Sequence, residues 1–253
     1  MGVLGKMLFW GGVAVAGGGL VYALTREEEA GAAMVPGEQR ASVLAVHPPQ
    51  EQNRCGSRVL VIGDSITATG YYKHIGLVGV EVKGQGWGGQ QAVKVARNAS
   101  SLLASFKPTD VVVLVGVNNV ASEVVSALKK GNADPVALAA HVQRDLTTAW
   151  KLIHDAGARV WAVKMTPWFG YAKYFGAGKA TAAPMRAVTL AVNGWIDAQR
   201  GQPGGPDEVI DTVSLGDASG ALQKQYSRDD LHPSAGGQKA LATIVEGALR
   251  GMR

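Results

Sequence analysis

Cysteine is almost absent from this chain. Cys55 is the only one in 253 residues, so an internal disulfide bond is excluded and no metal site can be built from cysteines. Charge is also sparse: 18% of residues are charged, the net charge is +5, and no cluster of lysine and arginine is interleaved with aromatic residues. We therefore expect no nucleic-acid partner. The 47% of apolar residues is typical of a globular protein.

Residues 8–24 carry no charge, with Lys6 before them and Arg26 and three glutamates after them. We interpret residues 1–29 as a membrane anchor, with the bulk of the chain outside the cytoplasm, in the periplasm or the extracellular space. A cleaved secretory signal is the main alternative, and it would make the protein secreted. A short core helix is a third interpretation, which the lack of a polar stripe disfavours. Residues 30–56 contain scattered prolines and no sustained period, which predicts a flexible linker.

Residues 57–253 alternate short apolar runs with longer helical patterns, which is typical of one α/β domain with parallel strands. The unbroken valine-rich run at 111–115 indicates a strand that is covered on both faces. We expect a three-layer α/β/α fold with a five-stranded parallel sheet, preceded by a hydrophobic helix at the amino terminus. Strands are expected at 58–62, 78–82, 110–117, 159–165 and 208–213, and helices at 90–106, 134–157, 183–199 and after Ser234.

The first strand ends abruptly in Gly63-Asp64-Ser65. The carboxyl edge of a parallel sheet is where ligands bind in open α/β folds, and a serine there is exposed on a rigid support. We interpret Ser65 as a nucleophile. A simple polar turn at the end of a strand is the alternative interpretation, so the other strand ends have to be considered.

A nucleophilic serine needs a base, an acid that orients this base, and donors for the oxyanion. His232 lies in a loop before the last helix, because Pro233 keeps it out of helical geometry. Asp229, three residues earlier, could fold back onto the imidazole, although a solvated polar loop is the alternative. Asn118 follows the strongest strand and could donate its amide, or simply form a turn. Glycines at 84–89 would let backbone N–H groups approach a reacting atom.

The glycine loop also fits the pattern G-x-G-x-x-G, which occurs in dinucleotide-binding folds. That pattern requires an acidic residue after the next strand to bind the ribose. Asp110 has about the right spacing, but it lies at the start of the next strand and therefore at the wrong edge of the sheet. We expect no cofactor.

Aromatic residues gather between residues 166 and 183, after the fourth strand. They either cover the core or form a wall that contacts substrate, because this loop too lies on the carboxyl edge of the sheet. The candidates for such a wall are Trp168 and Tyr171.

Four short blocks in this chain resemble those of the SGNH hydrolases, also called the GDSL esterase/lipase superfamily. The similar segments are Gly63-Asp64-Ser65-Ile66, Gly-Trp-Gly-Gly-Gln at 86–90, Gly116-Val117-Asn118 and Asp229-Asp230-Leu231-His232. Each block is short, but all four occur in the order found in the family and together span residues 63–232.

The resemblance implies a flavodoxin-like sheet, with Ser65 as nucleophile, His232 as base and Asp229 as its orienting partner. It also implies an oxyanion hole formed by the Ser65 backbone N–H, a backbone N–H of the glycine loop and the Asn118 side chain. Within the loop we choose Gly89. Gly88 is the next choice, since clustered glycines leave the alignment open. Asn119 departs from the family, in which aspartate often follows the third block, and this leaves the substrate class open.

From the resemblance and the amino-terminal segment we expect a membrane-tethered serine esterase that needs no metal. O-acetyl groups on envelope or extracellular polysaccharide are the expected substrate, ahead of lipid esters. An O-acyltransferase that uses the same residues is an alternative within enzymes. An inactive tethered module that binds glycans is the alternative outside them. The sequence makes no prediction about the oligomeric state.

Overall fold

The computed structural model describes residues 56–132, 134–167 and 182–251. The hydrophobic segment and the linker expected at the amino terminus lie outside these residues, as do Trp168 and Tyr171. Within the described ranges, no helix combines the length and the apolar character that crossing a membrane requires.

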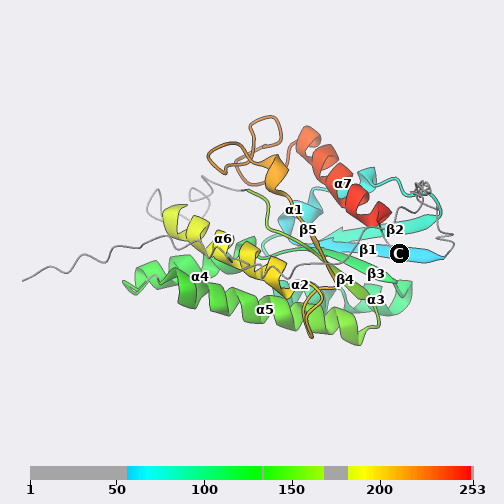
Figure 1. The fold of residues 1–253 in the computed structure, drawn as a ribbon, viewed down its shortest axis with the longest axis horizontal. Helices are drawn as coiled ribbons and strands as arrows, with labels where there is room; N and C mark the ends of the chain where they lie inside the picture. Colours follow the sequence, from blue (N-terminus) through cyan, green and yellow to red (C-terminus); the bar gives the residue numbers. More distant parts are fainter. Residues whose placement is uncertain (1–55, 133, 168–181, 252–253) are drawn as a thin grey trace, which may run out of the picture. The chain divides into compact units, whose positions relative to one another are not determined.

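Five parallel strands form one sheet in the order β2-β1-β3-β4-β5 (Figure 1). The expected three-layer α/β/α fold is therefore confirmed for the described residues. The strands are β1 (Ser57–Gly63), β2 (Val80–Gly86), β3 (Asp110–Leu114), β4 (Arg159–Val163) and β5 (Glu208–Ile210).

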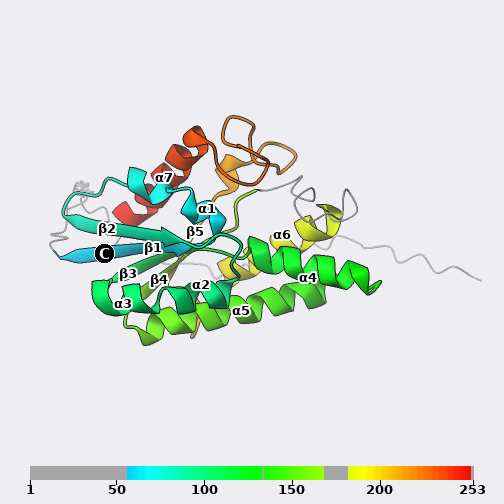
Figure 2. The same cartoon turned by 180° about the vertical axis from the view of Figure 1, so that it is seen from behind.

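Helices cover both faces of the sheet, as the two opposite views show (Figures 1 and 2). One face carries α1 (Ser65–Ala68), the 3-10 helix η1 (Tyr71–His74) and α7 (Ala235–Arg250), and α7 packs against η1. A second 3-10 helix, η4 (Val213–Leu215), follows β5. The other face carries α2 (Ala92–Asn98), α3 (Ser100–Phe106), α4 (Val117–Lys129), α5 (Pro135–Asp155) and α6 (Ala182–Gln199).

The core is centred on β1 and β3, where branched side chains are buried on both faces of the sheet. Residues 59–62 of β1 are fully buried, and every residue of β3 is buried. This burial explains why both strands read as continuous apolar runs instead of alternating patterns. The loops that leave the carboxyl ends of these strands therefore start from a rigid support.

The chain after β3 differs from the expectation. The strand expected to reach Val117 ends at Leu114, and Val117 begins α4, a helix that we did not predict. The apolar run extends past Leu114, and branched residues favour strands, so the boundary is hidden in the sequence. Gly116 breaks the strand with a φ of 131°, and Val117, Val120, Ala121 and Val124 then recur at helical spacing.

The remaining differences concern boundaries. β2 starts later than expected and continues through Gly84 and Gly86. Glycine is required at position 84, because a Cβ there would lie 2.3 Å from the Tyr72 ring. The helix expected at 90–106 is divided at Ala99 into α2 and α3. β4 and β5 end earlier than expected, whereas the helix that starts after Asp134 and the one capped by Ser234 lie where the sequence predicts them.

Replacement of Leu60 by alanine is expected to lower the free energy of unfolding by about 2–5 kcal/mol, because it leaves a cavity beneath β1. Leu60 has no exposed surface. Urea denaturation followed by circular dichroism measures the change. The control is Val78→Ala, which alters a side chain that is 96% exposed and should change stability by no more than about 0.5 kcal/mol. Equal effects of the two substitutions would contradict the assigned core.

Candidate active site

The turn that carries Ser65 leaves β1 at Gly63 and enters α1 directly. A Cβ at Gly63 would lie 2.2 Å from the Leu114 carbonyl oxygen, so only glycine allows β1 to run this close to the end of β3. Asp64 is the N-cap of α1, and its Oδ1 accepts a hydrogen bond of 3.0 Å from the Ile66 N–H. Ser65 is therefore held at the carboxyl edge of the sheet with its side chain partly exposed.

His232 lies against Ser65, although the two residues are 167 positions apart in the chain. Its Nε2 is 2.9 Å from the Ser65 Oγ, which is within hydrogen-bond distance. Its Nδ1 is 2.9 Å from Oδ2 of Asp229, whose Oδ1 also accepts from the His232 backbone N–H at 2.8 Å. The structure thus brings an alcohol, an imidazole and a carboxylate into one hydrogen-bonded row.

The loop that carries Asp229 and His232 is fixed by its own backbone. The Arg228 N–H donates to the His232 carbonyl at 2.9 Å, and Asp230 takes a left-handed φ of 68° between them. Leu231 is buried in the core, which anchors the loop from below. The imidazole is only 15% exposed, so its position is set by packing as well as by hydrogen bonds.

The glycine loop after β2 lies next to the serine turn. The Trp87 N–H donates to the Gly63 carbonyl at 2.9 Å, and a Cβ at Gly88 would lie 3.9 Å from the Ser65 Cβ. Gly89 adopts a φ of 71°, and a Cβ there would find no atom within 4 Å. Both glycines remain candidates for the oxyanion donor. Gly88 is the one with a Cα hydrogen that faces the Ser65 side chain.

Asn118 lies in the first turn of α4, next to the glycine loop. Its Nδ2 donates to the Gln90 carbonyl at 3.1 Å and to Oδ2 of Asp64 at 3.4 Å. The second hydrogen bond is long and therefore weak, so the N–H that points toward Asp64 is the one that can more easily turn to donate to an oxyanion. The amide therefore lies between the serine turn and the glycine loop.

Asn119, the departure from the family pattern, has a structural role. Its Oδ1 accepts from the Ala92 N–H at 2.9 Å, at the start of α2, and its Nδ2 donates to Oδ2 of Asp145 at 2.6 Å. This side chain is buried and ties α2, α4 and α5 together. Sequence reasoning missed this role, because α4 itself was not predicted.

Asp64 is a second residue that sequence reasoning passed over. Its carboxyl group is fully buried, next to the nucleophile. Burial raises the pKa of Asp64 from its usual 3.8 to about 7, although the hydrogen bond from the Ile66 N–H acts in the opposite direction. The aspartate in the Gly-Asp-Ser turn was the available signal, but nothing local in the sequence shows that it is buried.

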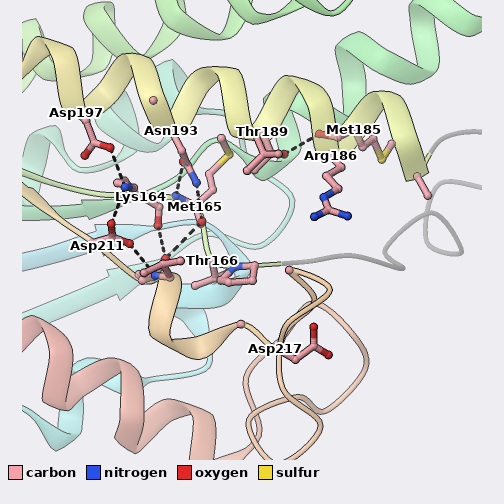
Figure 3. Close-up of a pocket in the computed structure, with 18 residues that line it drawn as sticks. Lys164, Met165, Thr166, Met185, Arg186, Thr189, Asn193, Asp197, Asp211 and Asp217 are labelled. Atoms are coloured by element: carbon pink, nitrogen blue, oxygen red, sulfur yellow. Dashed lines mark hydrogen bonds and ion pairs between the residues drawn. The ribbon is translucent and has the colours of Figure 1, made fainter. Parts of the chain in front are cut away.

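A separate cavity of about 320 Å³ lies between α6 and the loops that follow β4 and β5 (Figure 3). Lys164 closes one end, where it binds Asp197 at 2.8 Å and Asp211 at 2.7 Å. At the other end, Arg186 extends from α6 toward the loop that carries Asp217 (Figure 3). Neither Ser65 nor His232 lines this cavity.

In the part of the chain that the structure describes, no group of three or more histidine, cysteine, aspartate and glutamate side chains is arranged to hold a metal ion.

A family model identifies the same region by sequence. The model described as "GDSL-like Lipase/Acylhydrolase family" matches residues 61–240, which include all four blocks noted above. A search of the curated proteins gives no match.

Solved structures share the fold at low sequence identity. A protein from Streptococcus pneumonia, described as a putative platelet activating factor, has a TM-score of 0.56 and 20% identity, covering 76% of this chain and 84% of its own. A GDSL-like lipase from Bacteroides thetaiotaomicron has a TM-score of 0.54 and 16% identity, covering 76% and 87%. An acetyl xylan esterase has a TM-score of 0.53 and 16% identity, covering 76% and 99%.

The substitution Asp64→Asn is expected to reduce the fall in melting temperature that the unsubstituted protein shows as the pH rises from 5 to 8. The raised pKa means that the folded state binds this proton more tightly than the unfolded state. The contribution of Asp64 to stability is thus fully present below about pH 4 and is lost as the pH approaches 7. The total loss is on the order of 4 kcal/mol. Calorimetry of both proteins across this range measures the difference, and a difference that does not change with pH would contradict the assignment.

Proposed function

The chain belongs to the GDSL-like lipase/acylhydrolase family, whose members are serine ester hydrolases, and on this premise we propose that Ser65, His232 and Asp229 are its catalytic triad. The observation that carries the proposal is the row of contacts from Ser65 Oγ through the imidazole to Asp229, each of 2.9 Å. These distances are short enough for a proton to pass from the hydroxyl to the ring while the carboxylate holds the other ring nitrogen.

In the first half of the reaction, Ser65 Oγ attacks the ester carbonyl carbon while His232 Nε2 accepts the hydroxyl proton. Asp229 accepts the Nδ1–H bond throughout and stabilises the imidazolium without being protonated. The tetrahedral intermediate then collapses: the bond from carbon to the alcohol oxygen breaks, and the alcohol leaves with the proton from Nε2. An acyl-serine at position 65 remains.

In the second half, water attacks the acyl-serine and gives a proton to His232 Nε2. Collapse of the second intermediate breaks the bond to Ser65 Oγ, which recovers its proton, and the carboxylic acid is released. In both halves the negative oxygen is held by the Ser65 backbone N–H, the Asn118 amide and a backbone N–H of the glycine loop, for which we keep Gly89 as the first choice and Gly88 as the second. Donors of this kind act most strongly when they are held in place before the charge develops.

The proposed substrate class is an O-acetylated polysaccharide of the cell envelope or the extracellular space, with deacetylation as the reaction. An acetyl xylan esterase has this fold, so the scaffold accommodates removal of acetyl groups from a polymer. The uncharged segment at residues 8–24 supports a location outside the cytoplasm, either anchored or secreted. In this proposal the anchor places the enzyme next to the envelope.

Replacement of Ser65 by alanine is expected to lower kcat for p-nitrophenyl acetate hydrolysis by about 10⁴-fold or more, because no acyl-enzyme can form. Labelling by a fluorophosphonate probe should disappear with it. The control is Ser101→Ala, an exposed serine on α3, which should keep both the activity and the label. Retained turnover by a folded Ser65→Ala protein would overturn the mechanism.

Two adjacent aspartates allow a matched test of the triad. Asp229→Asn should lower kcat by about 10⁴-fold, because an amide that donates to Nδ1 forces the proton onto Nε2, which then cannot accept one from Ser65. Asp230→Asn should leave kcat nearly unchanged, since Asp230 is exposed and asparagine tolerates its left-handed backbone. Similar rates for the two variants in steady-state assays would rule out the assigned role of Asp229.

A further inference from the structure

A groove of about 580 Å³ lies beside the reaction centre, along α2 and α4. Gly89 and Asn118 line one part of it, and these are two of the three groups that we propose as oxyanion donors. A substrate bound at Ser65 can therefore extend into this groove without leaving the protein surface.

The side chains along the groove are mainly polar, and the charged ones are all cationic. Its polar lining beyond Asn118 consists of Gln90, Gln91, Lys94, Ser122, Ser126 and Lys129, and the apolar side chains that the described part of the chain contributes are those of Ala121 and Val125. Among the described residues, none of those that line it is an aspartate or a glutamate. Polar and cationic side chains of this kind can hydrogen-bond and pair with a hydrophilic ligand.

The two lysines are available to a ligand. Both are exposed, and neither forms an ion pair with any described residue. The nearby carboxylates on α4 and α5 are engaged elsewhere: Glu123 contacts His141 at 2.9 Å, and Asp145 accepts from Asn119 at 2.6 Å. Positive charge along the groove is thus not neutralised by these neighbouring carboxylates.

The cavity beneath α6 offers the opposite environment. Three aspartates line it, at positions 197, 211 and 217, together with Lys164 and Arg186. The positive charge of Lys164 is already engaged there, because its Nζ contacts Asp197 at 2.8 Å and Asp211 at 2.7 Å. Among the described residues, this cavity therefore offers an anion less uncompensated positive charge than the groove along α2 and α4.

We propose that this groove binds the body of the substrate and selects an anionic acylated polymer, in which carboxylate or phosphate groups contact Lys94 and Lys129. The proposal rests on the proposed function, because it places the ester at Ser65, and it specifies the substrate class for that same site. Both lysines are exposed, so each contact contributes modestly, and the selectivity decreases as salt screens the charges.

The test uses the full chain and three chemically O-acetylated dextrans of equal length and acetyl content: neutral, carboxymethylated and phosphorylated. We expect kcat/KM at low salt to be about tenfold higher for the anionic polymers than for the neutral one. The difference between the carboxymethylated and phosphorylated polymers identifies which anion the groove prefers. Equal kcat/KM values for all three polymers would overturn the proposal.

The double substitution Lys94→Glu and Lys129→Glu should remove this preference, mainly by raising KM for the anionic polymers. The matched control is Lys73→Glu with Lys239→Glu, which makes the same change in net charge on η1 and α7, across the sheet from the groove. The control should keep both the preference and the hydrolysis of p-nitrophenyl acetate. An equal loss of preference in both double variants would show a net-charge effect and overturn the groove assignment.

Binding without turnover separates this proposal from the proposed function. Ser65→Ala protein should bind the carboxymethylated or phosphorylated dextran more tightly than the neutral one in equilibrium titrations, and the added pair of lysine substitutions should abolish the difference. Failure of the unsubstituted protein to hydrolyse p-nitrophenyl acetate would count against the catalytic mechanism, whereas equal binding of all three polymers would count against the groove.

Discussion

The hydrogen bond between Ser65 Oγ and His232 Nε2 is the contact on which the rest of the site depends. It joins the first strand of the domain to the loop before its last helix. The packing of α7 against η1 maintains it, because η1 follows the serine turn closely and α7 begins just after His232. The Gly76 N–H also donates to Glu246 of α7 at 2.8 Å. The serine turn and the histidine loop are thus tied to the same pair of helices.

The serine turn is rigid, and its rigidity has a thermodynamic cost. Gly63 allows β1 to end in close contact with β3, and Asp64 caps α1 from a fully buried position. A buried carboxylate without a cationic partner is unfavourable, which is why the pKa of Asp64 rises. Its Oδ2 nevertheless accepts a hydrogen bond from the Asn118 amide. Local instability at an active site is common where a geometry needed for chemistry overrides the most stable arrangement.

Periodicity in the sequence was sufficient to predict most of the fold. Local patterns predicted the buried runs of β1 and β3, the Asp134 cap of α5 and the Ser234 cap of α7, because each of these features has a local cause. The start of α4 could not be recognised in the sequence, since the valine-rich run of β3 continues into the first turn of this helix. The end of β2 was hidden for a related reason: its glycines are required by contacts with η1 and α1, which no local pattern records.

The sequence by itself determined which chemical groups follow the strands, and in what order, since Ser65, Asn118 and the Asp229-to-His232 loop are readable from composition and spacing. Only the tertiary structure decided which of their atoms meet. Elements that are far apart in the chain meet in the contact of His232 with Ser65 and in the hydrogen bonds of Asn119, and their packing also buries Asp64. Such contacts are set by how helices pack on the sheet, and a periodic pattern fixes the face that each helix buries but not the partner that it meets.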